Sequence, residues 1–533
     1  MKVRYKYFNF YICAVDSMLN KCKQYEKYQD RDVLRESCGV FGIISTTNDI
    51  VDYIYNGIFS LQHRGQDGAG IATILRNENL DGDAKINIKK GADFVSRVFE
   101  NFDFSLLRGN LGVGSVRYPT VGQSRDEDAQ PFYVENIREG LAIAHNGNLV
   151  NYKQLREELV KEGFNFISDG DAEIILHAVS RELKKNDNIF EAIKQTMRKI
   201  EGAYSDVIAT GRGELIAFRD PHAIRPLVWA IERNPITNNE ITSIIVASES
   251  VAFDINNKSN SIEFMGELMP GELLLVKNEN NKININKKVI LNPADTQKKH
   301  CMFEYVYFSR PDSKVDKNKY VYDIRVKLGE ELAKIMPIDA DIIIPVPDTA
   351  RPAADGYSKI SNIPVKEGLI KNRYIPRTFI MPSQDKREDG VRLKFNTINS
   401  VIKNKKIILI DDSIVRGTTL KKIINLLKQN GAKEVHVRIT APPIIAPCFY
   451  GIDMANHKQL IAYKYNQDIE KIRKEIGADS LAYQTIDQLI KSINLPKSDL
   501  CLACLNNEYP TKEAQRIANE MKKVNNNKER YYE

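Results

Sequence analysis

One stretch constrains the fold of this chain more than any other: residues 405–435, KKIILIDDSIVRGTTLKKIINLLKQNGAKEV. It begins with the uninterrupted apolar run Ile407–Ile410, which is typical of a strand buried on both faces. The next apolar residues recur with the period of a helix: Leu420, Ile423, Ile424 and Leu427. Gly431 supplies a helix C-terminus, and a second β-type run, EVHVRIT, follows. A strand, a helix and a strand in this order predict a parallel sheet with crossover helices.

The loop between this strand and helix is rich in groups that bind polar ligands. Asp411 and Asp412 come first, followed by Ser413, Ile414, Val415, Arg416, Gly417, Thr418 and Thr419. Ligands of open α/β sheets bind beyond the carboxyl ends of the strands. There, backbone N–H groups, hydroxyls and a helix N-terminus suit a phosphate, while carboxylates suit ribose hydroxyls or Mg²⁺. The alternative is that Asp412 or Thr418 merely caps the helix.

Two further segments carry groups suited to the same site. The stretch IIIPVPDTARPAA (342–354) is another apolar strand followed by a turn, at which Asp348 and Thr349 stand. Segment 371–396 is strongly basic, and three of its residues are candidates for phosphate contact: Lys371, Arg373 and Arg377. Such a charge run is usually a solvated surface loop, but beside a phosphate site it also suits a lid that excludes water.

These motifs resemble those of type I phosphoribosyltransferases, which are α/β domains with a parallel sheet, and IILIDDSIVRGTT matches their fingerprint for phosphoribosyl pyrophosphate (PRPP). The resemblance implies that Asp411 and Asp412 hold the ribose diol and one Mg²⁺ per subunit, while Ser413–Thr419 cradles the 5′-phosphate. It makes Asp348–Thr349 the pyrophosphate loop, with the Thr349 hydroxyl directed to Mg²⁺ or diphosphate. The basic lid is expected to close only over bound PRPP.

The first half of the chain has a different pattern. From residue 38 to about 275, short β-type runs alternate with Gly-rich turns, and helical patterns occupy 152–162 and 171–184. This predicts a mixed α+β domain rich in antiparallel strands. The polar stretch 277–300 is the best candidate for a domain boundary. We therefore expect the chain to divide into these parts: 1–37, a leader; 38–285, the first domain; 286–510, the second domain; 511–533, a tail of frayed helix or disorder.

Four motifs of the first domain resemble those of N-terminal-nucleophile (Ntn) glutamine amidotransferases, which have a four-layer αββα fold. They are LQHRGQDGAGI (61–71), GSVRYPTVG (114–122), AHNGNLVN (144–151) and SDGDAEI (168–174). Joined to the PRPP motifs, they resemble the amidophosphoribosyltransferase family from Cys38 to about residue 510. That family converts PRPP, glutamine and water to 5-phosphoribosylamine, glutamate and pyrophosphate, the first committed step of de novo purine synthesis.

The resemblance gives Cys38 a role that explains the residues before it. The thiolate would attack glutamine to form a glutamyl thioester, with the α-amine of Cys38 itself as the base. Because that nitrogen is an amide while Met1–Ser37 remains attached, we expect the leader to be a propeptide cut after Ser37. Translation could also begin at Met18, and a shorter leader would still need removal.

The same resemblance assigns the remaining groups of the glutamine site. Asn146 and Gly147 would form the oxyanion hole, Arg117 would pair with the α-carboxylate of glutamine, and Asp171 would bind its α-ammonium. Arg64 is placed at the glutamine site, where it would order the loop, and two histidines are expected to be structural: His63 and His145. The alternatives are that Asn146–Gly147 is a hairpin turn and that Asp171 is a helix cap.

The cysteines do not predict a disulfide framework, because seven are scattered over a long chain. Four of them could hold Zn²⁺ or a [4Fe–4S] cluster: Cys301, Cys448, Cys501 and Cys504. Their positions resemble the cluster-bearing members of the family, which implies one structural [4Fe–4S] cluster per subunit. Cys13 and Cys22 lie in the leader and are expected to bind nothing.

Composition limits the other partners. A chain of 533 residues suits two or three domains, and a net charge of +7 over that length does not predict nucleic-acid binding. No apolar run approaches the roughly 20 residues of a membrane span, and the start MKVRYKYFNFYICAV suits neither a secretory nor an organellar signal. We therefore expect a cytoplasmic protein. The family implies a homotetramer and feedback inhibition by AMP or GMP.

Two other functions fit parts of the sequence. One is another Ntn glutamine amidotransferase that delivers ammonia to a different acceptor; the PRPP motif argues against it. The other is a regulatory protein that senses PRPP or purines on a phosphoribosyltransferase fold. Such a sensor would not need Cys38, Arg117, Asn146 and Asp171 together.

Overall fold

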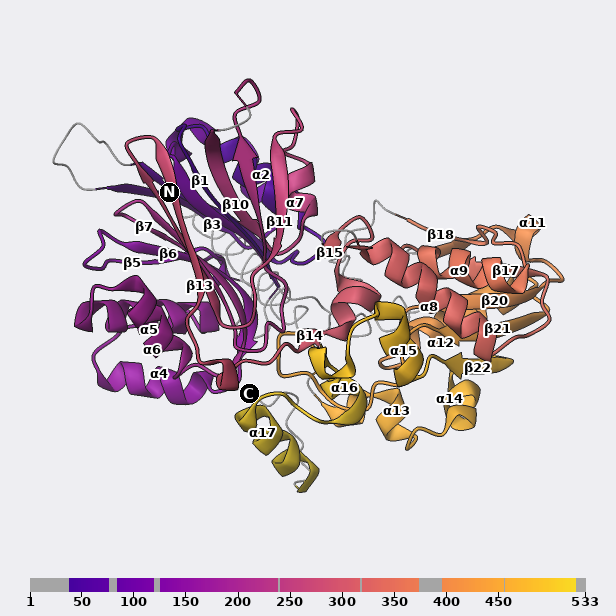
Figure 1. The fold of residues 1–533 in the computed structure, drawn as a ribbon. Helices are drawn as coiled ribbons and strands as arrows, with labels where there is room; N and C mark the ends of the chain where they lie inside the picture. Colours follow the sequence, from indigo (N-terminus) through magenta and orange to yellow (C-terminus); the bar gives the residue numbers. More distant parts are fainter. Residues whose placement is uncertain are drawn as a thin grey trace, which may run out of the picture.

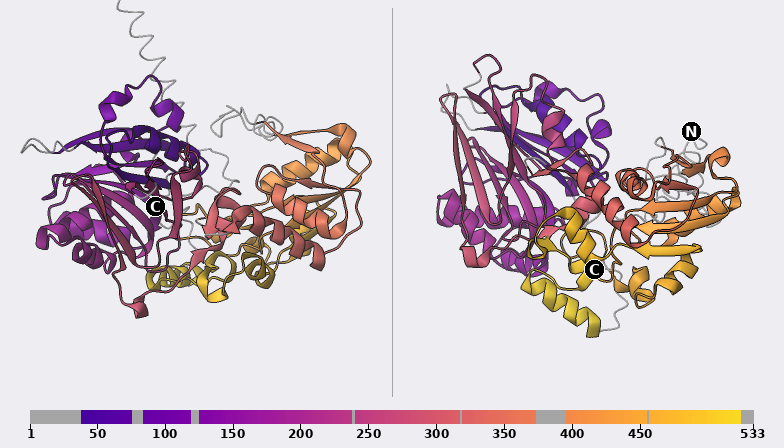
Figure 2. Two further views of the ribbon diagram at one scale, coloured as in Figure 1. Left: turned by 45° about the horizontal axis from the view of Figure 1, so that its top comes forward. Right: turned by 45° about the vertical axis from the view of Figure 1, so that its right-hand side comes forward.

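The computed structural model describes residues 38–75, 84–118, 125–237, 240–316, 319–372, 395–454 and 456–523. Two halves lie side by side: the first is built on two large sheets, and the second on a smaller sheet flanked by helices (Figure 1). The last helices of the chain lie at the junction of the two halves in all three views (Figures 1 and 2).

Two antiparallel sheets of different size stack face to face in the first half. The seven-stranded sheet has the order β11-β9-β10-β1-β4-β2-β3. Its strands are β1 (Gly39–Ser45), β2 (Gly68–Leu75), β3 (Lys85–Gly91), β4 (Leu111–Arg117), β9 (Val228–Arg233), β10 (Ile241–Ala247) and β11 (Ile262–Glu267). The six-stranded sheet has the order β13-β12-β8-β7-β6-β5. Its strands are β5 (Phe132–Val134), β6 (Leu141–Leu149), β7 (Gly202–Thr210), β8 (Glu214–Arg219), β12 (Glu272–Glu279) and β13 (Lys282–Val289).

Helices cover the outer face of each sheet. The seven-stranded sheet is covered by α2 (Val51–Ser60), α3 (Val95–Val98) and α7 (Val251–Asp254). The six-stranded sheet is covered by α4 (Tyr152–Lys161), α5 (Asp171–Lys185) and α6 (Ile189–Met197). A separate apolar core lies between the two sheets and includes Val40, Val207 and Leu215. The layers therefore run helix, sheet, sheet, helix, which is the predicted αββα order, and both predicted helices are present.

The second half contains a parallel sheet in the order β17-β20-β21-β22. Its strands are β17 (Ile342–Pro345), β20 (Lys406–Asp411), β21 (Glu434–Ile439) and β22 (Ser480–Tyr483), and its main helices are α8 (Val321–Ile335), α9 (Arg351–Ser361), α12 (Thr418–Gln429) and α14 (Ile469–Ile476). Ile408 and Ile410 pack toward α8 and α9, whereas Ile407 and Leu409 pack toward α12 and α14. The apolar run of β20 is thus buried on both faces, as predicted.

Two predicted boundaries are wrong. Residue 285 lies inside β13, which pairs with β12 over its whole length, so the predicted boundary falls within an edge strand whose residues are mostly exposed. The predicted tail contains α17 (Lys512–Lys523), whose small apolar stripe is fully buried at the junction of the halves: Ala514, Ile517 and Ala518. The sequence did not predict β13 and α17 because both segments are mostly polar, and each buries only one narrow apolar face.

Shorter strands complete the second half. β14 (His300–Cys301) pairs in parallel with β23 (Leu500–Cys501), and β18 (Leu369–Lys371) pairs antiparallel with β19 (Phe395–Thr397). None of the helices in the described part of the chain is long and apolar enough to span a membrane.

Candidate active sites

Cys38 lies at the start of β1, where its neighbours come from β4 and from the loop that precedes β5. Gly39 is paired with Val116, so Cys38 is adjacent to Arg117 and Tyr118 at the end of β4. The Cys38 Sγ is 3.9 Å from the Tyr118 carbonyl oxygen and 4.0 Å from Nε2 of Gln130. The thiol is buried, and Arg117 is buried beside it. The predicted nucleophile and the predicted carboxylate-binding arginine therefore occupy one corner of the sheet.

Two side chains that the sequence did not single out tie Cys38 to β6. Ser248 Oγ accepts a hydrogen bond from the backbone N–H of Val40 (3.0 Å) and another from Nδ2 of Asn146 (3.2 Å). The Oε1 of Gln130 accepts the N–H of His145 (2.7 Å), while its Nε2 points at the Cys38 sulfur. These two bridges bring the nucleophile's strand and the predicted oxyanion donors together.

Asn146 and Gly147 lie within β6 rather than in a hairpin turn, since they are paired with Ser205 and Tyr204 of β7. Gly147 has φ +159°, and a Cβ there would lie 1.9 Å from the carbonyl oxygen of Ala203. Only glycine fits this close approach between the two backbones. The hairpin alternative is therefore wrong, and the Asn–Gly pair is fixed by its sheet.

Asp171 is the first residue of α5, and the N-cap is Gly170, so the capping alternative is also wrong. Its Oδ2 accepts the N–H of Leu149 (3.1 Å) and lies 3.5 Å from Nε2 of His145. His145 Nδ1 lies 2.6 Å from Asp206, which agrees with the predicted structural role of this histidine.

The neighbouring charges determine the protonation states of His145 and Asp171. Burial works against the charged form of His145, but Asp171 and Asp206 outweigh it and raise the pKa of His145 well above its ordinary value. Burial likewise works to raise the pKa of Asp171, but the His145 charge and the Leu149 N–H lower it overall. Asp171 is thus held as a carboxylate, the form that pairs with an ammonium group.

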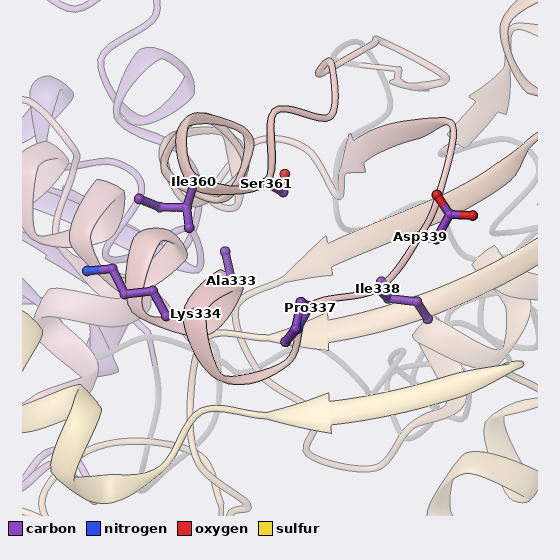
Figure 3. A pocket seen from close by; sticks show the side chains of 7 residues that line it. All are labelled: Ala333, Lys334, Pro337, Ile338, Asp339, Ile360 and Ser361. Carbon is purple, nitrogen blue, oxygen red and sulfur yellow. The ribbon is translucent and has the colours of Figure 1, made fainter.

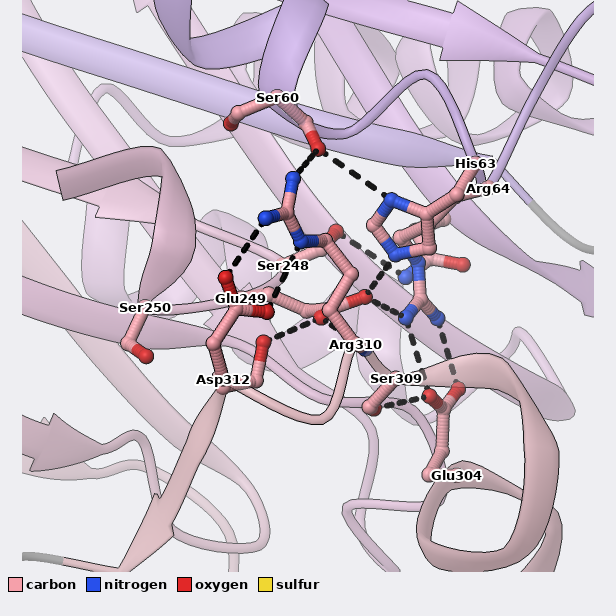
Figure 4. A network of polar contacts seen from close by, with 12 residues as sticks. Ser60, His63, Arg64, Ser248, Glu249, Ser250, Glu304, Ser309, Arg310 and Asp312 are labelled. Atoms are coloured by element: carbon pink, nitrogen blue, oxygen red, sulfur yellow. Dashed lines mark hydrogen bonds and ion pairs between the residues drawn. The ribbon is translucent and has the colours of Figure 1, made fainter. Parts of the chain in front are cut away.

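Arg64 is fully buried between two glutamates from distant parts of the chain (Figure 4). Its Nη2 lies 2.7 Å from Glu304, its Nη1 contacts both Glu304 and Glu249, and its Nε donates to the carbonyl oxygen of Cys38 (3.4 Å). His63 also binds Glu249 (2.7 Å), which supports its predicted structural role. These contacts favour the loop-ordering role for Arg64 over a direct bond to glutamine.

Asp411 and Asp412 lie at the carboxyl end of β20. Thr349 Oγ1 donates to Asp412 Oδ2 (2.7 Å), and Ser413 Oγ donates to Asp412 Oδ1 (2.8 Å). Burial and repulsion from Asp412 raise the pKa of Asp411 well above its ordinary value, and burial also raises that of Asp412. Two adjacent carboxylates with raised pKa values, together with a hydroxyl, form a donor set that suits a hard divalent cation.

The loop after these aspartates leads directly into α12. Gly417, at φ +84°, is the N-cap, and α12 has no side-chain cap, so neither Asp412 nor Thr418 caps the helix. Ile414 is buried in the core, which leaves its backbone for ligand contact. The uncapped first turn of a 12-residue helix supplies N–H donors and a positive dipole end, which suit a phosphate.

A pocket of about 360 Å³ opens beside this loop, lined by Arg416, Thr418, Lys458, Gln459, Ile461, Lys464 and Glu475. Arg416 Nη2 donates to Gln459 (2.6 Å) at its edge. A second pocket, of about 540 Å³, lies between the C-terminal ends of α8 and α9 (Figure 3). Its lining contains no predicted site residue, and its volume alone assigns it no chemistry.

The predicted pyrophosphate loop lies at the carboxyl end of β17. Lys371 Nζ is 3.3 Å from Asp348 Oδ2, so β18 brings this lysine to the loop. Arg351 Nε lies 3.8 Å from the other carboxylate oxygen of Asp348. Arg373 and Arg377, with the rest of the predicted lid, fall outside the described residues.

The four predicted ligand cysteines lie in one apolar cluster at the junction of the halves. Cys301 and Cys501 are directly paired in β14–β23, and Ile445 and Ala446, just before Cys448, donate N–H bonds to the Cys504 carbonyl. Burial raises the pKa of Cys504 well above its ordinary value, and the other three thiols raise it further. Within the described ranges, no three His, Cys, Asp or Glu side chains converge tightly enough for one metal ion. The four thiols are free and close enough to influence one another.

Comparison with known proteins finds relatives of both halves. A family model described as a glutamine amidotransferase domain matches residues 118–254, and one described as a phosphoribosyl transferase domain matches 308–442. The amidophosphoribosyltransferase of Methanothermobacter thermautotrophicus is 44% identical over 481 residues, which cover 90% of this chain and 95% of that protein. The chain belongs to the amidophosphoribosyltransferase family.

Other members of the family give the same result. The Bacillus subtilis amidophosphoribosyltransferase is 40% identical over 488 residues, 90% of this chain and 95% of the relative. A solved structure of the B. subtilis glutamine PRPP amidotransferase, complexed with ADP and GMP, has a TM-score of 0.78 at 38% identity and covers 89% of this chain and 98% of its own. The family and the fold predicted from the motifs are confirmed.

Proposed function

We propose that this chain transfers the amide nitrogen of glutamine to PRPP. The products are 5-phosphoribosylamine, glutamate and pyrophosphate, and the reaction is the first committed step of de novo purine synthesis. One observation carries the proposal: a single chain combines a buried Cys38 tied to Asn146 through Ser248 with a two-aspartate loop at the end of a parallel strand. Membership of the amidophosphoribosyltransferase family, a family of pentosyltransferases, supports the same reaction.

In the glutamine half, the thiolate of Cys38 attacks the amide carbon, and ammonia leaves with the proton of the thiol as a glutamyl thioester forms. Water then hydrolyses the thioester, which releases glutamate and restores the thiol. The base is the α-amine of Cys38, whose ordinary pKa of about 7.7–8.0 leaves it partly neutral near pH 7. The side-chain N–H of Asn146 and the backbone N–H of Gly147 stabilise the oxyanion, and such a donor is typically worth about 10²–10³ in rate. Arg117 and Asp171 bind the two charged groups at the α-carbon of glutamine.

This mechanism requires the residues before Cys38 to be removed. An α-nitrogen held in a peptide bond has no lone pair available to accept a proton. The leader Met1–Ser37 is therefore a propeptide in this proposal, and maturation exposes Cys38.

In the transferase half, ammonia forms a bond to C1 of PRPP while the bond to pyrophosphate breaks. Asp411, Asp412 and Thr349 would hold one Mg²⁺, which would neutralise charge on the diphosphate. Asp411 and Asp412 also bind the ribose hydroxyls, and Ser413–Thr419 binds the 5′-phosphate through the uncapped N-terminus of α12. Lys371 is the proposed contact for the pyrophosphate, and its Nζ lies 3.3 Å from Asp348 Oδ2, which supports this role.

Four thiols in the junction cluster suit one [4Fe–4S] cluster, because thiolates are the ligands that such clusters use. Cys301, Cys448, Cys501 and Cys504 would be the ligands, and their burial would keep the cluster away from water. Purified protein should contain iron and sulfide and absorb broadly near about 400 nm. Stoichiometric zinc without iron would overturn this assignment, whatever the activity of the sample.

Further properties follow from the family rather than from these residues. We place the enzyme in the cytoplasm as a homotetramer and propose AMP or GMP as feedback inhibitors that compete at the phosphate loop. A relative solved with ADP and GMP supports nucleotide binding. Light scattering on purified protein tests the tetramer, and inhibition that rising PRPP relieves tests competition.

The deciding experiment measures pyrophosphate release by processed enzyme. It should require PRPP together with either glutamine or ammonia, and glutamate should form in step with pyrophosphate when glutamine is the donor. A glutaminase that releases no pyrophosphate would indicate a different acceptor. Binding of PRPP without turnover would indicate a sensor.

A further inference from the structure

A segment from the transferase side of the molecule packs against the predicted oxyanion hole. Asn148 Nδ2 in β6 donates to the carbonyl oxygen of Phe449 (2.9 Å). Gly451 has φ +98°, and a Cβ on it would lie 3.1 Å from the carbonyl oxygen of Gly147 and 3.2 Å from its carbonyl carbon. Residues 449–451 thus touch the strand that presents Asn146 and Gly147, about 300 positions away in the sequence (301 for the Asn148–Phe449 bond).

A network of buried ion pairs also connects Gly451 to the backbone of Cys38. Arg225, which has no exposed surface, donates from Nη2 to the carbonyl oxygen of Gly451 (2.9 Å) and from Nη1 to Glu304 (2.9 Å). Glu304 also pairs with Arg64 (Figure 4). The Nε of Arg64 in turn donates to the Cys38 carbonyl oxygen. Both reacting parts of the glutamine site are therefore attached to residues that lie beyond the first domain.

We propose that Gly451, Phe449 and Glu304 are positioning residues that complete the glutamine site from the transferase half. Residues 449–451 fix the β6 strand at Gly147, and Glu304 fixes Cys38 through Arg64. The inference rests on the proposed glutaminase role of Cys38, Asn146 and Gly147. It adds that the first domain alone does not hold these groups in reactive geometry.

The physical reason is the narrow tolerance of an oxyanion hole. Its donors stabilise the transition state only when they lie about 2.7–3.1 Å from the developing oxyanion. A functional group keeps such geometry when a second layer of packing and hydrogen bonds holds it. For Gly147 that layer consists of Ala203 on one side and Gly451 on the other.

The test is Gly451→Ala, with Gly477→Ala as the matched control. Both glycines have positive φ, +98° and +75°, so alanine strains the backbone at both positions. Only the Gly451 Cβ would press on Gly147, since the nearest atom to a Cβ at Gly477 is an Asn425 oxygen at 3.8 Å. The comparison separates contact with the oxyanion strand from general backbone strain.

The expected result concerns the nitrogen donor. In Gly451→Ala, glutamine-dependent pyrophosphate release should fall about tenfold to a hundredfold through kcat, because the oxyanion donors are displaced. The ammonia-dependent rate should stay within about twofold, since the acceptor site for ammonia does not depend on that strand's register. Gly477→Ala should leave both rates within about twofold of the parent.

Other outcomes decide against the inference. An equal loss with glutamine and with ammonia in Gly451→Ala, or no loss with either, would overturn it. If Gly451→Ala does not fold, Asn148→Ala is the second test, because it removes the hydrogen bond to Phe449. The inference then requires that kcat falls with glutamine and not with ammonia. Failure of the proposed function itself is recognised separately, because the parent enzyme would then release no pyrophosphate with PRPP and ammonia.

Discussion

The two catalytic centres of this molecule are built in opposite ways. In the glutamine half, buried charges are balanced within the protein: Arg64 lies between Glu249 and Glu304, and His145 lies between Asp171 and Asp206. In the transferase half, Asp411 and Asp412 are adjacent acids with raised pKa values, and α12 begins without a side-chain cap. The charges of the second centre are left for a ligand to balance.

This difference indicates how each half stabilises its reacting groups. A centre whose buried charges are already paired and which is held by sheet pairing is preorganised for one transition state. A centre with like charges and an uncapped helix end gains stability only when a cation and an anion arrive. Substitutions in the first centre should therefore lower kcat with glutamine. Substitutions in the second should weaken the use of PRPP and Mg²⁺ whichever nitrogen donor is supplied.

The largest expected effect separates the two halves completely. Cys38→Ala removes the proposed nucleophile, so glutamine-dependent pyrophosphate release should fall to background, a loss of at least about 10³. The ammonia-dependent rate should stay within about threefold, because the acceptor site is unchanged. Steady-state assays with each nitrogen donor measure both rates, and substantial glutamine turnover by this variant would remove Cys38 from the mechanism.

Asp412→Asn should act on the other half. It removes the acceptor of the Thr349 and Ser413 hydroxyls and one carboxylate of the cation site. Pyrophosphate release should fall about 10²-fold or more with glutamine and with ammonia alike. Alkylation of Cys38 by iodoacetamide, followed by mass spectrometry, should proceed at the parent rate. A loss restricted to glutamine would contradict the division between the centres.

A smaller effect is expected at Thr349, whose hydroxyl donates to Asp412 at 2.7 Å. Hydrogen bonds to charged groups contribute about 1.5–3 kcal/mol, so Thr349→Val should raise the Mg²⁺ concentration needed for half-maximal activity about tenfold or more. Thr349→Ser is the matched control, because it keeps the hydroxyl and loses only a methyl group. Equal Mg²⁺ requirements in the two variants would show that the hydroxyl has no part in the site.

The smallest effect tests the charge balance around His145. Because its folded pKa is raised, the stability it contributes is fully present below its unfolded pKa of about 6.5 and is lost as pH rises through the folded value. The free energy of unfolding, and with it the urea concentration at the midpoint, should therefore fall as pH rises above neutrality. His145→Gln should show a shallower fall, and identical pH slopes in the two proteins would contradict a charged His145.

Local patterns predicted the parts of this molecule that local physics determines. The β20–α12 unit and the Asn146–Gly147 strand were found because apolar runs, helical periodicity and motif spacing lie within a few residues of one another. The edge strand β13 has the polar composition of a boundary segment because six of its eight residues are exposed. The buried stripe of α17 consists of only three residues, two of which are alanines.

The supporting residues could not be found in this way. Ser248 meets Val40 across 208 positions, and Glu304 meets Arg64 across 240. No periodicity or motif connects such pairs, because their proximity follows from how the sheets stack and how the two halves meet. The reacting groups of the candidate centres could thus be predicted from sequence motifs. The residues that hold those groups in place could be identified only from the folded structure.

The central claim is that Cys38 acts as a chain terminus, with its own nitrogen serving as the base for its sulfur. Intact-mass and N-terminal analysis of enzyme purified in active form tests it most directly. The active polypeptide should begin at Cys38, and glutamine-dependent activity should rise as the uncleaved form disappears. Full glutamine-dependent activity in a preparation whose chains all retain Met1–Ser37 would contradict it.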